Sequence, residues 1–130
     1  MADSPAFAAT VNNAAALISA ANTNLDGASG TRVTVFTAGV NGSRIDTIKI
    51  QAVVTTTAGM VRLWLHNGTT AFLFDEVVVA AITVGASTEA FSAVLTYSGA
   101  TLLVLKSGWT LQASTHNAES FHVHVFGGDF

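Results

Sequence analysis

Apolar and polar residues alternate with a period of two along much of the chain. In the stretch from Ile45 to Val54, Ile48 and Ile50 share one face, whereas Lys49 and Gln51 share the other. This alternation is typical of a β-strand with one buried face. Together with the β-branched and aromatic residues and the Gly, Asn and Ser clusters between them, it predicts eight strands, at residues 32–38, 45–54, 60–65, 70–79, 91–97, 102–105, 109–115 and 121–126.

Eight short strands without helices between them predict an all-β fold, an antiparallel sandwich or barrel. We favour a jelly-roll-like antiparallel β-sandwich of about eight strands. The dipeptide Asn67-Gly68 predicts a hairpin between Met60–His66 and Thr70–Val79. A type I′ turn is expected there, with both turn residues left-handed and Gly68 at positive φ.

The N-terminal segment allows two interpretations. The run from Ala14 to Ala21 favours a short helix through the helix propensity of alanine, or an edge strand flanked by asparagines. We therefore divide the chain into residues 1–24, an N-terminal arm or edge strand, and residues 25–130, the β-sandwich domain. The arm is small-residue-rich and nearly uncharged, so it is expected to lie along a neighbouring subunit at a sheet edge.

Composition excludes several classes of function. The 130 residues suit one domain, and only 10% of them are charged, with a formal net charge of −3. Its five scattered basic residues build no patch for nucleic acid. The chain has no cysteine, which excludes disulfides and thiolate chemistry. No apolar run approaches the roughly 20 residues of a membrane span, and no basic region suggests a signal peptide. We expect neither nucleic acid nor membrane as a partner.

Two histidines form a weak candidate metal site. His122 and His124 are two residues apart on a predicted strand, so they share a face. A working site needs a third ligand, which His116 or Glu119 in the preceding loop would have to supply. The same His-x-His pattern also arises on the solvated face of a strand. We therefore predict no metal and no cofactor.

Catalytic chemistry finds no support in the sequence. No nucleophile motif such as Gly-x-Ser-x-Gly is present. Asp75 and Glu76 are adjacent in a predicted strand and point to opposite faces, so they cannot act on one substrate. One of them is expected to meet Arg62 across the hairpin. The chain is predicted not to be an enzyme.

Two aromatic residues fall on faces opposite the aliphatic rows. Trp64 alternates with Arg62 and His66, and Phe126 shares the face of His122 and His124. They belong to a second layer of the core, covered by the chain termini, or they meet a partner. Large apolar groups outside a core tend to mark interfaces, so Arg62, Trp64, His66 and Phe126 are our interface candidates.

Several strings resemble a family of small structural proteins of tailed-bacteriophage virions. The similarity covers nearly the whole chain and rests on residues 15–24, 35–39, 41–45, 59–63, 66–68, 113–119 and the closing Gly127-Gly128-Asp129-Phe130. The family resembles head decoration, or cement, proteins with jelly-roll folds. The resemblance brings no catalytic motif, so no site residue is transferred.

The resemblance implies a non-enzymatic capsid decoration protein, made in the host cytoplasm and located on the capsid surface of the virion. Its expected partners are the major capsid protein and further copies of itself, as a homotrimer. The alternative is a structural component of the phage tail, baseplate or fibre that packs against other subunits or binds host glycans. Copy number in the virion separates the two, because decoration proteins occur in hundreds.

Overall fold

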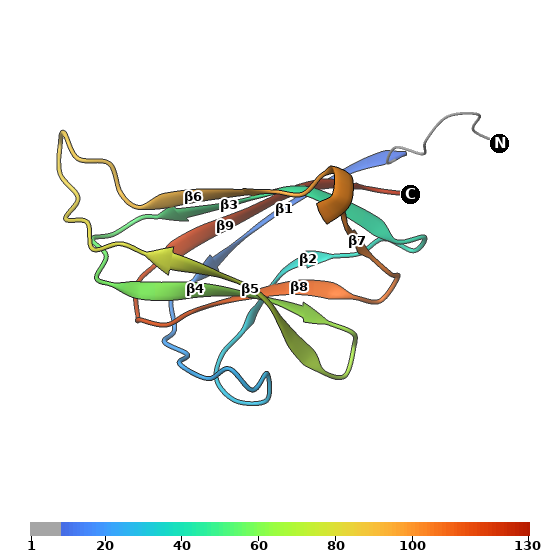
Figure 1. Ribbon diagram of the computed structural model, residues 1–130, viewed down its shortest axis with the longest axis horizontal. Coiled ribbons are helices and arrows are strands. Elements are labelled where there is room, and N and C mark those ends of the chain that lie inside the picture. Colours follow the sequence, from blue (N-terminus) through green and yellow to red (C-terminus); the bar gives the residue numbers. More distant parts are fainter. Residues whose placement is uncertain (1–8) are drawn as a thin grey trace.

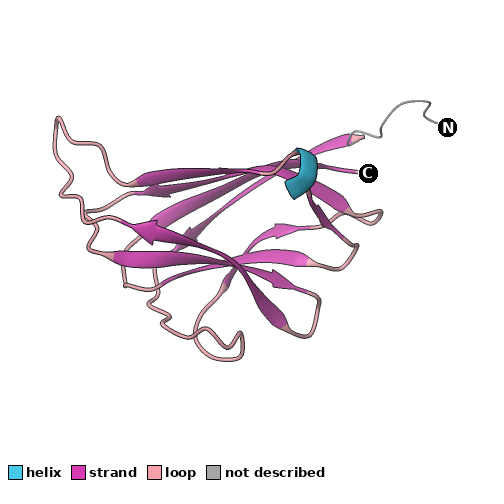
Figure 2. Ribbon diagram, in the orientation of Figure 1, coloured by secondary structure: helices cyan, strands magenta, loops and turns pink. Residues whose placement is uncertain are grey.

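The computed structural model describes residues 9–130, which form two stacked sheets (Figures 1 and 2). Residues 1–8, the first part of the predicted arm, lie outside the described residues. The described chain contains nine strands and one short 3-10 turn: β1 (Thr10–Ile18), β2 (Val33–Thr37), β3 (Ser43–Ala52), β4 (Gly59–His66), β5 (Ala71–Val79), β6 (Ser92–Thr96), η1 (Gly99–Thr101), β7 (Leu103–Leu105), β8 (Thr110–Thr115) and β9 (Phe121–Asp129).

The strand order is that of a jelly roll. The first sheet, called sheet A, has the order β1-β9-β3-β6, with β7 also pairing with β3, and the second, sheet B, has the order β2-β8-β4-β5. The antiparallel pairs are nested along the chain: first strand with last, second with second last, and so inward to the β4–β5 hairpin. Successive pairs alternate between the two sheets, as in a double Greek key. The predicted antiparallel β-sandwich is confirmed.

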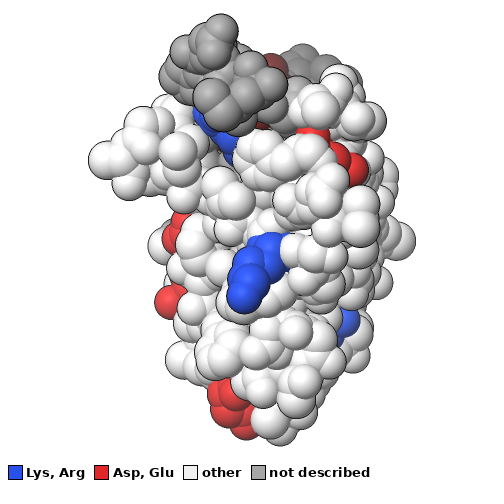
Figure 3. Space-filling model, turned by 90° about the vertical axis from the view of Figure 1, so that its right-hand side faces the viewer, with Lys and Arg blue, Asp and Glu red and all other residues white. Residues whose placement is uncertain are grey.

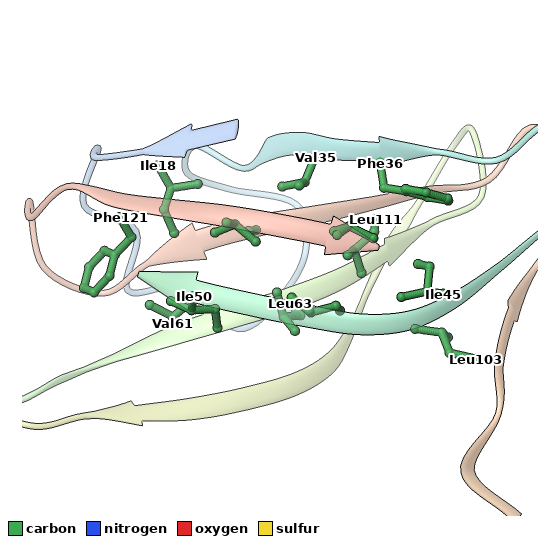
Figure 4. Close-up of a cluster of buried hydrophobic side chains, with 14 of the residues drawn as sticks. Ile18, Val35, Phe36, Ile45, Ile50, Val61, Leu63, Leu103, Leu111 and Phe121 are labelled. Carbon is green, nitrogen blue, oxygen red and sulfur yellow. The ribbon is translucent and has the colours of Figure 1, made fainter. Parts of the chain in front are cut away.

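The core lies between the two sheets and follows from the period-two pattern. In β9, Phe121, Val123 and Val125 are buried, and the histidines between them face outward. In the neighbouring strand β3, Ile48 and Ile50 are also buried and lie beside Val125 and Val123 on the same face of sheet A. Figure 4 shows Phe121 and Ile50 in the cluster of buried hydrophobic side chains, together with Val61 and Leu63 of β4. Each buried aliphatic or aromatic side chain contributes about 1.5–3 kcal/mol to folding.

All eight predicted strands correspond to β2–β9, and the N-terminal segment adds a ninth. Of the two interpretations for this segment, residues 10–18 form the edge strand and pair with β9 over nine residues. The only described helical turn is η1, which separates β6 from β7. A helix at Ala14–Ala21 is therefore wrong, because β9 offers a complete row of main-chain partners there. The division at residue 24 stays a prediction.

The β4–β5 hairpin forms as predicted, but its turn differs. Gly68 has φ of 98°, whereas no described residue other than glycine has positive φ. The type I′ assignment is therefore wrong, because Asn67 is not left-handed. Instead, the Asn67 side-chain Oδ1 accepts hydrogen bonds from the main-chain N–H groups of Thr69 and Thr70, at 2.9 and 2.8 Å. An asparagine side chain thus closes a loop that the expected turn would have closed with main-chain geometry.

Candidate interaction surfaces

The outer face of sheet B is covered around Trp64 by another part of the chain. Trp64 is only 1% exposed, and its Nε1 donates a hydrogen bond of 2.9 Å to Ser114 Oγ. The Arg32 guanidinium lies 5.5 Å from the centre of the Trp64 ring. Gly27 approaches so closely that a Cβ there would lie 3.5 Å from the ring. The segment between β1 and β2 therefore forms a second layer, and Trp64 as a partner-facing residue is wrong.

Arg62, the second interface candidate, is also buried, at 6% exposure. Its Nε forms an ion pair of 2.9 Å with Glu76 Oε2, which confirms the predicted contact across the hairpin. Its Nη1 donates to the carbonyl oxygen of Asn22 at 3.4 Å and lies 3.2 Å from His116 Nδ1. Since a guanidinium only donates, His116 Nδ1 is the acceptor there. Arg62 thus ties the covering segment to sheet B and is not available to a partner.

Asp75 points to the opposite face from Glu76, as expected for neighbours in a strand. It accepts a long hydrogen bond of 3.4 Å from the Tyr97 hydroxyl. Burial, followed by the nearby Asp75 charge and this hydrogen bond, raises the pKa of Tyr97. The two carboxylates therefore serve separate structural contacts.

The candidate third ligands for His122 and His124 are held elsewhere. Glu119 Oε2 accepts hydrogen bonds of 2.8 Å from both the main-chain N–H and the hydroxyl of Thr57, and His116 contacts Arg62. The rings of His122 and His124 lie 6.4 Å apart, edge to face. Among residues 9–130 there is no group of three or more potential metal ligands. The structure thus leaves these two histidines as a pair.

The outer face of sheet A is exposed to solvent. Phe126 is 42% exposed and stacks on His124, with ring centres 6.3 Å apart and an interplanar angle of 5°. Beside these rings, Ala15, Ala16 and Leu17 of β1 and the two histidines line a shallow hollow of about 220 Å³. Of the four interface candidates, Phe126 is on this open face. His66 is half-buried at the end of β4, where its Nδ1 accepts a hydrogen bond from Gly68 N–H at 3.1 Å.

Sequence reasoning missed most of the exposed apolar surface. Fifteen large hydrophobic residues of the described chain are exposed, including Phe72, Leu73 and Phe74 of β5 and Val94 of β6. The residues of β5 before Asp75 form a continuous apolar run, so alternation alone does not show which of them are exposed. Figure 3 shows broad uncharged areas between isolated Lys, Arg, Asp and Glu side chains. No described helix is long and apolar enough to cross a membrane.

The fold and surface define a jelly-roll sandwich in which the outer face of sheet B is covered around Trp64 and Arg62, whereas Phe126 is exposed on the outer face of sheet A. No protein-family model matches the chain, and no curated protein matches it. Among solved structures, the chain is similar to a chain of the "Cyanophage Pam1 capsid asymmetric unit", with a TM-score of 0.49 and 17% sequence identity. The match covers 100% of this chain and 92% of the other. A likeness at this level assigns neither family nor role.

Proposed function

We propose that this protein is a non-enzymatic structural protein of a bacteriophage virion that decorates the outer capsid shell. It acts by binding the major capsid protein and further copies of itself, with a homotrimer as the expected assembly. It would be made in the host cytoplasm and function on the capsid surface. The sequence resemblance to small tailed-phage structural proteins suggested this role, and the surface of the fold supports it.

The observation that carries the proposal is the combination of scarce charge and exposed apolar side chains. Only 10% of residues are charged, yet fifteen large hydrophobic residues of residues 9–130 lie at the surface. Large apolar side-chain surface outside a core tends to mark contact with other proteins. A partner that covers it gains the free energy of removing that area from water, about 25 cal/mol per Å².

Sheet A supplies the proposed shell-binding face. It carries Phe126 stacked on His124, with the hollow beside Ala15 next to the rings. An aromatic side chain that inserts into a partner's pocket commonly dominates the binding energy of an interface. His66 lies at the end of β4 in sheet B, and we propose it as a peripheral contact. Modest contacts repeated over many symmetric copies stiffen a shell without any chemistry.

The test mixes purified protein with undecorated heads and measures the bound fraction after sedimentation. Phe126→Lys should weaken binding about tenfold or more, because it removes the proposed aromatic anchor. Val40→Lys is the matched control, since Val40 is 84% exposed and lies in the loop between β2 and β3, outside the strands of both sheets. Equal binding by the two variants would contradict the assignment of the sheet A face.

The second candidate is a tail, baseplate or fibre component that binds host glycans. The stacked rings of His124 and Phe126 favour it, because flat aromatic faces also suit sugar rings. Immunolabelling of virions distinguishes the two locations. Labelling of tails in small copy number, with no binding of the intact protein to heads, would replace the decoration proposal with this one.

A further inference from the structure

Strand β6 is the least protected edge of the sandwich. Other chains can pair with a long or uncovered edge strand, and proteins prevent this pairing with charges, bulges or covering segments. β5 carries Asp75 and Glu76 and has a register shift opposite Leu63 and Trp64. β1 is flanked by β2, with Asn12 Nδ2 donating to the Thr37 carbonyl oxygen at 3.3 Å. β6 pairs with β3 without a register shift and contains no charge and no proline.

The main-chain groups that β6 presents outward follow from its pairing with β3. Ala52 N–H donates to the carbonyl oxygen of Phe91, and Tyr97 N–H donates to that of Asp46, both at 2.8 Å. In an antiparallel pair, residues whose main-chain groups bond to the neighbouring strand alternate with residues whose main-chain groups do not. The N–H and C=O groups of residues 91, 93, 95 and 97 therefore point toward β3. Ser92, Val94 and Thr96 therefore direct their N–H and C=O groups away from the sheet. No described strand lies on that side.

The side chains of this segment form a chemical palindrome about Val94. Reading outward in both directions, Val94 is flanked by the aliphatic pair Ala93 and Leu95, the hydroxyl pair Ser92 and Thr96, and the aromatic pair Phe91 and Tyr97. A two-fold axis brings residue 94 opposite itself, 93 opposite 95, and 92 opposite 96. Each side chain then meets one of its own chemical kind, a small alanine facing a larger leucine.

We propose that two copies of this chain pair antiparallel through β6, about a two-fold axis at Val94. The two copies then share one continuous sheet of ten strands, β1-β9-β3-β6 followed by β6-β3-β9-β1 of the second copy, with β7 of each copy also paired with its own β3. The outward main-chain groups of residues 92, 94 and 96 become mutual hydrogen-bond partners. Ser92 lies opposite Thr96 of the second copy, a pairing that stabilises antiparallel strands.

Charge and exposure favour a second copy as the occupant. No charged residue occurs between Glu89 and Lys106, so two identical edges meet without repulsion. Val94 is 60% exposed on the outer face of β6, and in the pair it packs against Val94 of the second copy. A foreign strand would have to reproduce this order of aromatic, hydroxyl and aliphatic residues. The chain itself supplies that order.

This pairing goes beyond the proposed capsid role and does not depend on it. An isologous contact relates two copies only, so it is additional to the three-fold contact of the proposed trimer. Copies joined only through β6 form dimers, and trimers joined through β6 form hexamers. The expected mass is therefore an even multiple of the 13.3 kDa chain mass. Failure to bind heads would leave this expectation unchanged.

The first experiment uses sedimentation equilibrium on the full-length protein and two charge variants. Ser92→Lys with Thr96→Lys places lysine opposite lysine twice, and it should halve the wild-type mass. Ser92→Glu with Thr96→Lys places glutamate opposite lysine twice, and it should retain the wild-type mass. Both residues are exposed, so the fold tolerates either change. A monomeric or trimeric wild type, or an unchanged mass in the double-lysine variant, would overturn the proposal.

The second experiment fixes the register by cross-linking under diamide. The chain has no cysteine, so one introduced thiol reports one contact. Val94→Cys should form a disulfide dimer, because directly opposed Cα atoms lie about 5.5 Å apart. Ser92→Cys is the matched control: its counterpart is displaced by four residues, about 13–14 Å along the strand. Cross-linking of the control as fast as Val94→Cys would refute the axis at Val94.

Discussion

Close packing of Gly27 against β5 holds the segment between β1 and β2 over Trp64, and we expect Gly27→Ala to displace this segment. Gly27 has φ of 70°, in the left-handed region, and a Cβ at this position would overlap the carbonyl oxygen of Ala71. A residue other than glycine costs about 1–2 kcal/mol in this conformation. The overlap with main chain of β5 adds about 1–3 kcal/mol, the usual cost of overpacking.

Gly68→Ala is the matched control because it shares only the first of these costs. Gly68 has φ of 98°, and no atom lies within 4 Å of a Cβ placed there. Its loss should be about 1–2 kcal/mol. Gly68→Val adds a β-branched side chain in the same conformation, so it should exceed 1 kcal/mol.

Urea unfolding measures the free energy of both variants, and tryptophan fluorescence reports on the cover. The chain has two tryptophans, so a Trp109→Phe background leaves Trp64 as the only tryptophan, which is excited selectively over Tyr97. The native Trp64 emission should shift to longer wavelength in Gly27→Ala and stay unchanged in Gly68→Ala. If the two alanine variants have equal stability and equal emission, the close packing of Gly27 against β5 does not hold the layer.

Two further predictions concern polar contacts. Hydrogen bonds from Ser43 Oγ, then the Asn12 side chain, then Gly39 N–H hold the pKa of Asp129 below its ordinary value of 3.8. A lowered pKa stabilises the fold above pH 4, and this stabilisation is lost as the pH falls through the folded-state pKa. Asp129→Asn should therefore be less stable than the wild type at pH 7. Urea unfolding at a series of pH values should show this difference in stability closing below pH 4. Arg62→Met removes the donor from three acceptors and should cost about 2–4 kcal/mol in urea unfolding. Arg44→Met, which breaks only an exposed pair, should cost under about 1 kcal/mol, and equal losses would contradict the buried network.

Alternation predicted strands such as β3, β4 and β9 because each of them has one face in the core. It could not predict that the chain covers part of the outer face of sheet B. Trp64 and Arg62 occupy the polar phase of β4, and the segment that covers them has no periodic pattern. Its contacts come instead from a glycine that approaches Ala71 closely and from the Asn22 carbonyl oxygen. These contacts exist only after the chain has crossed from sheet A to sheet B.

Strand order was likewise beyond the reach of local pattern. The palindrome at Phe91–Tyr97 is visible in the sequence, but it has meaning only for a strand at an edge. The nested pairing places β6 at the edge of sheet A, next to β3 alone. Conversely, Asn67-Gly68 predicted the hairpin correctly but not its turn. The Asn67 side chain accepts hydrogen bonds from the N–H groups of Thr69 and Thr70, so the loop does not need a type I′ geometry.

The two sheets of this sandwich differ in what they leave for other molecules. Sheet B has the part of its outer face around Trp64 and Arg62 covered by its own chain. Sheet A keeps a bare face, with Phe126, and a free edge, β6. Pairing through β6 uses main-chain N–H and C=O groups that lie in the plane of the sheet. The outer face of sheet A therefore stays exposed, and the dimer has twice the area of this face. Two copies then present two Phe126 anchors on one continuous sheet. If a shell protein repeats at a matching spacing, the second anchor binds at high effective concentration, which strengthens attachment without a new kind of contact.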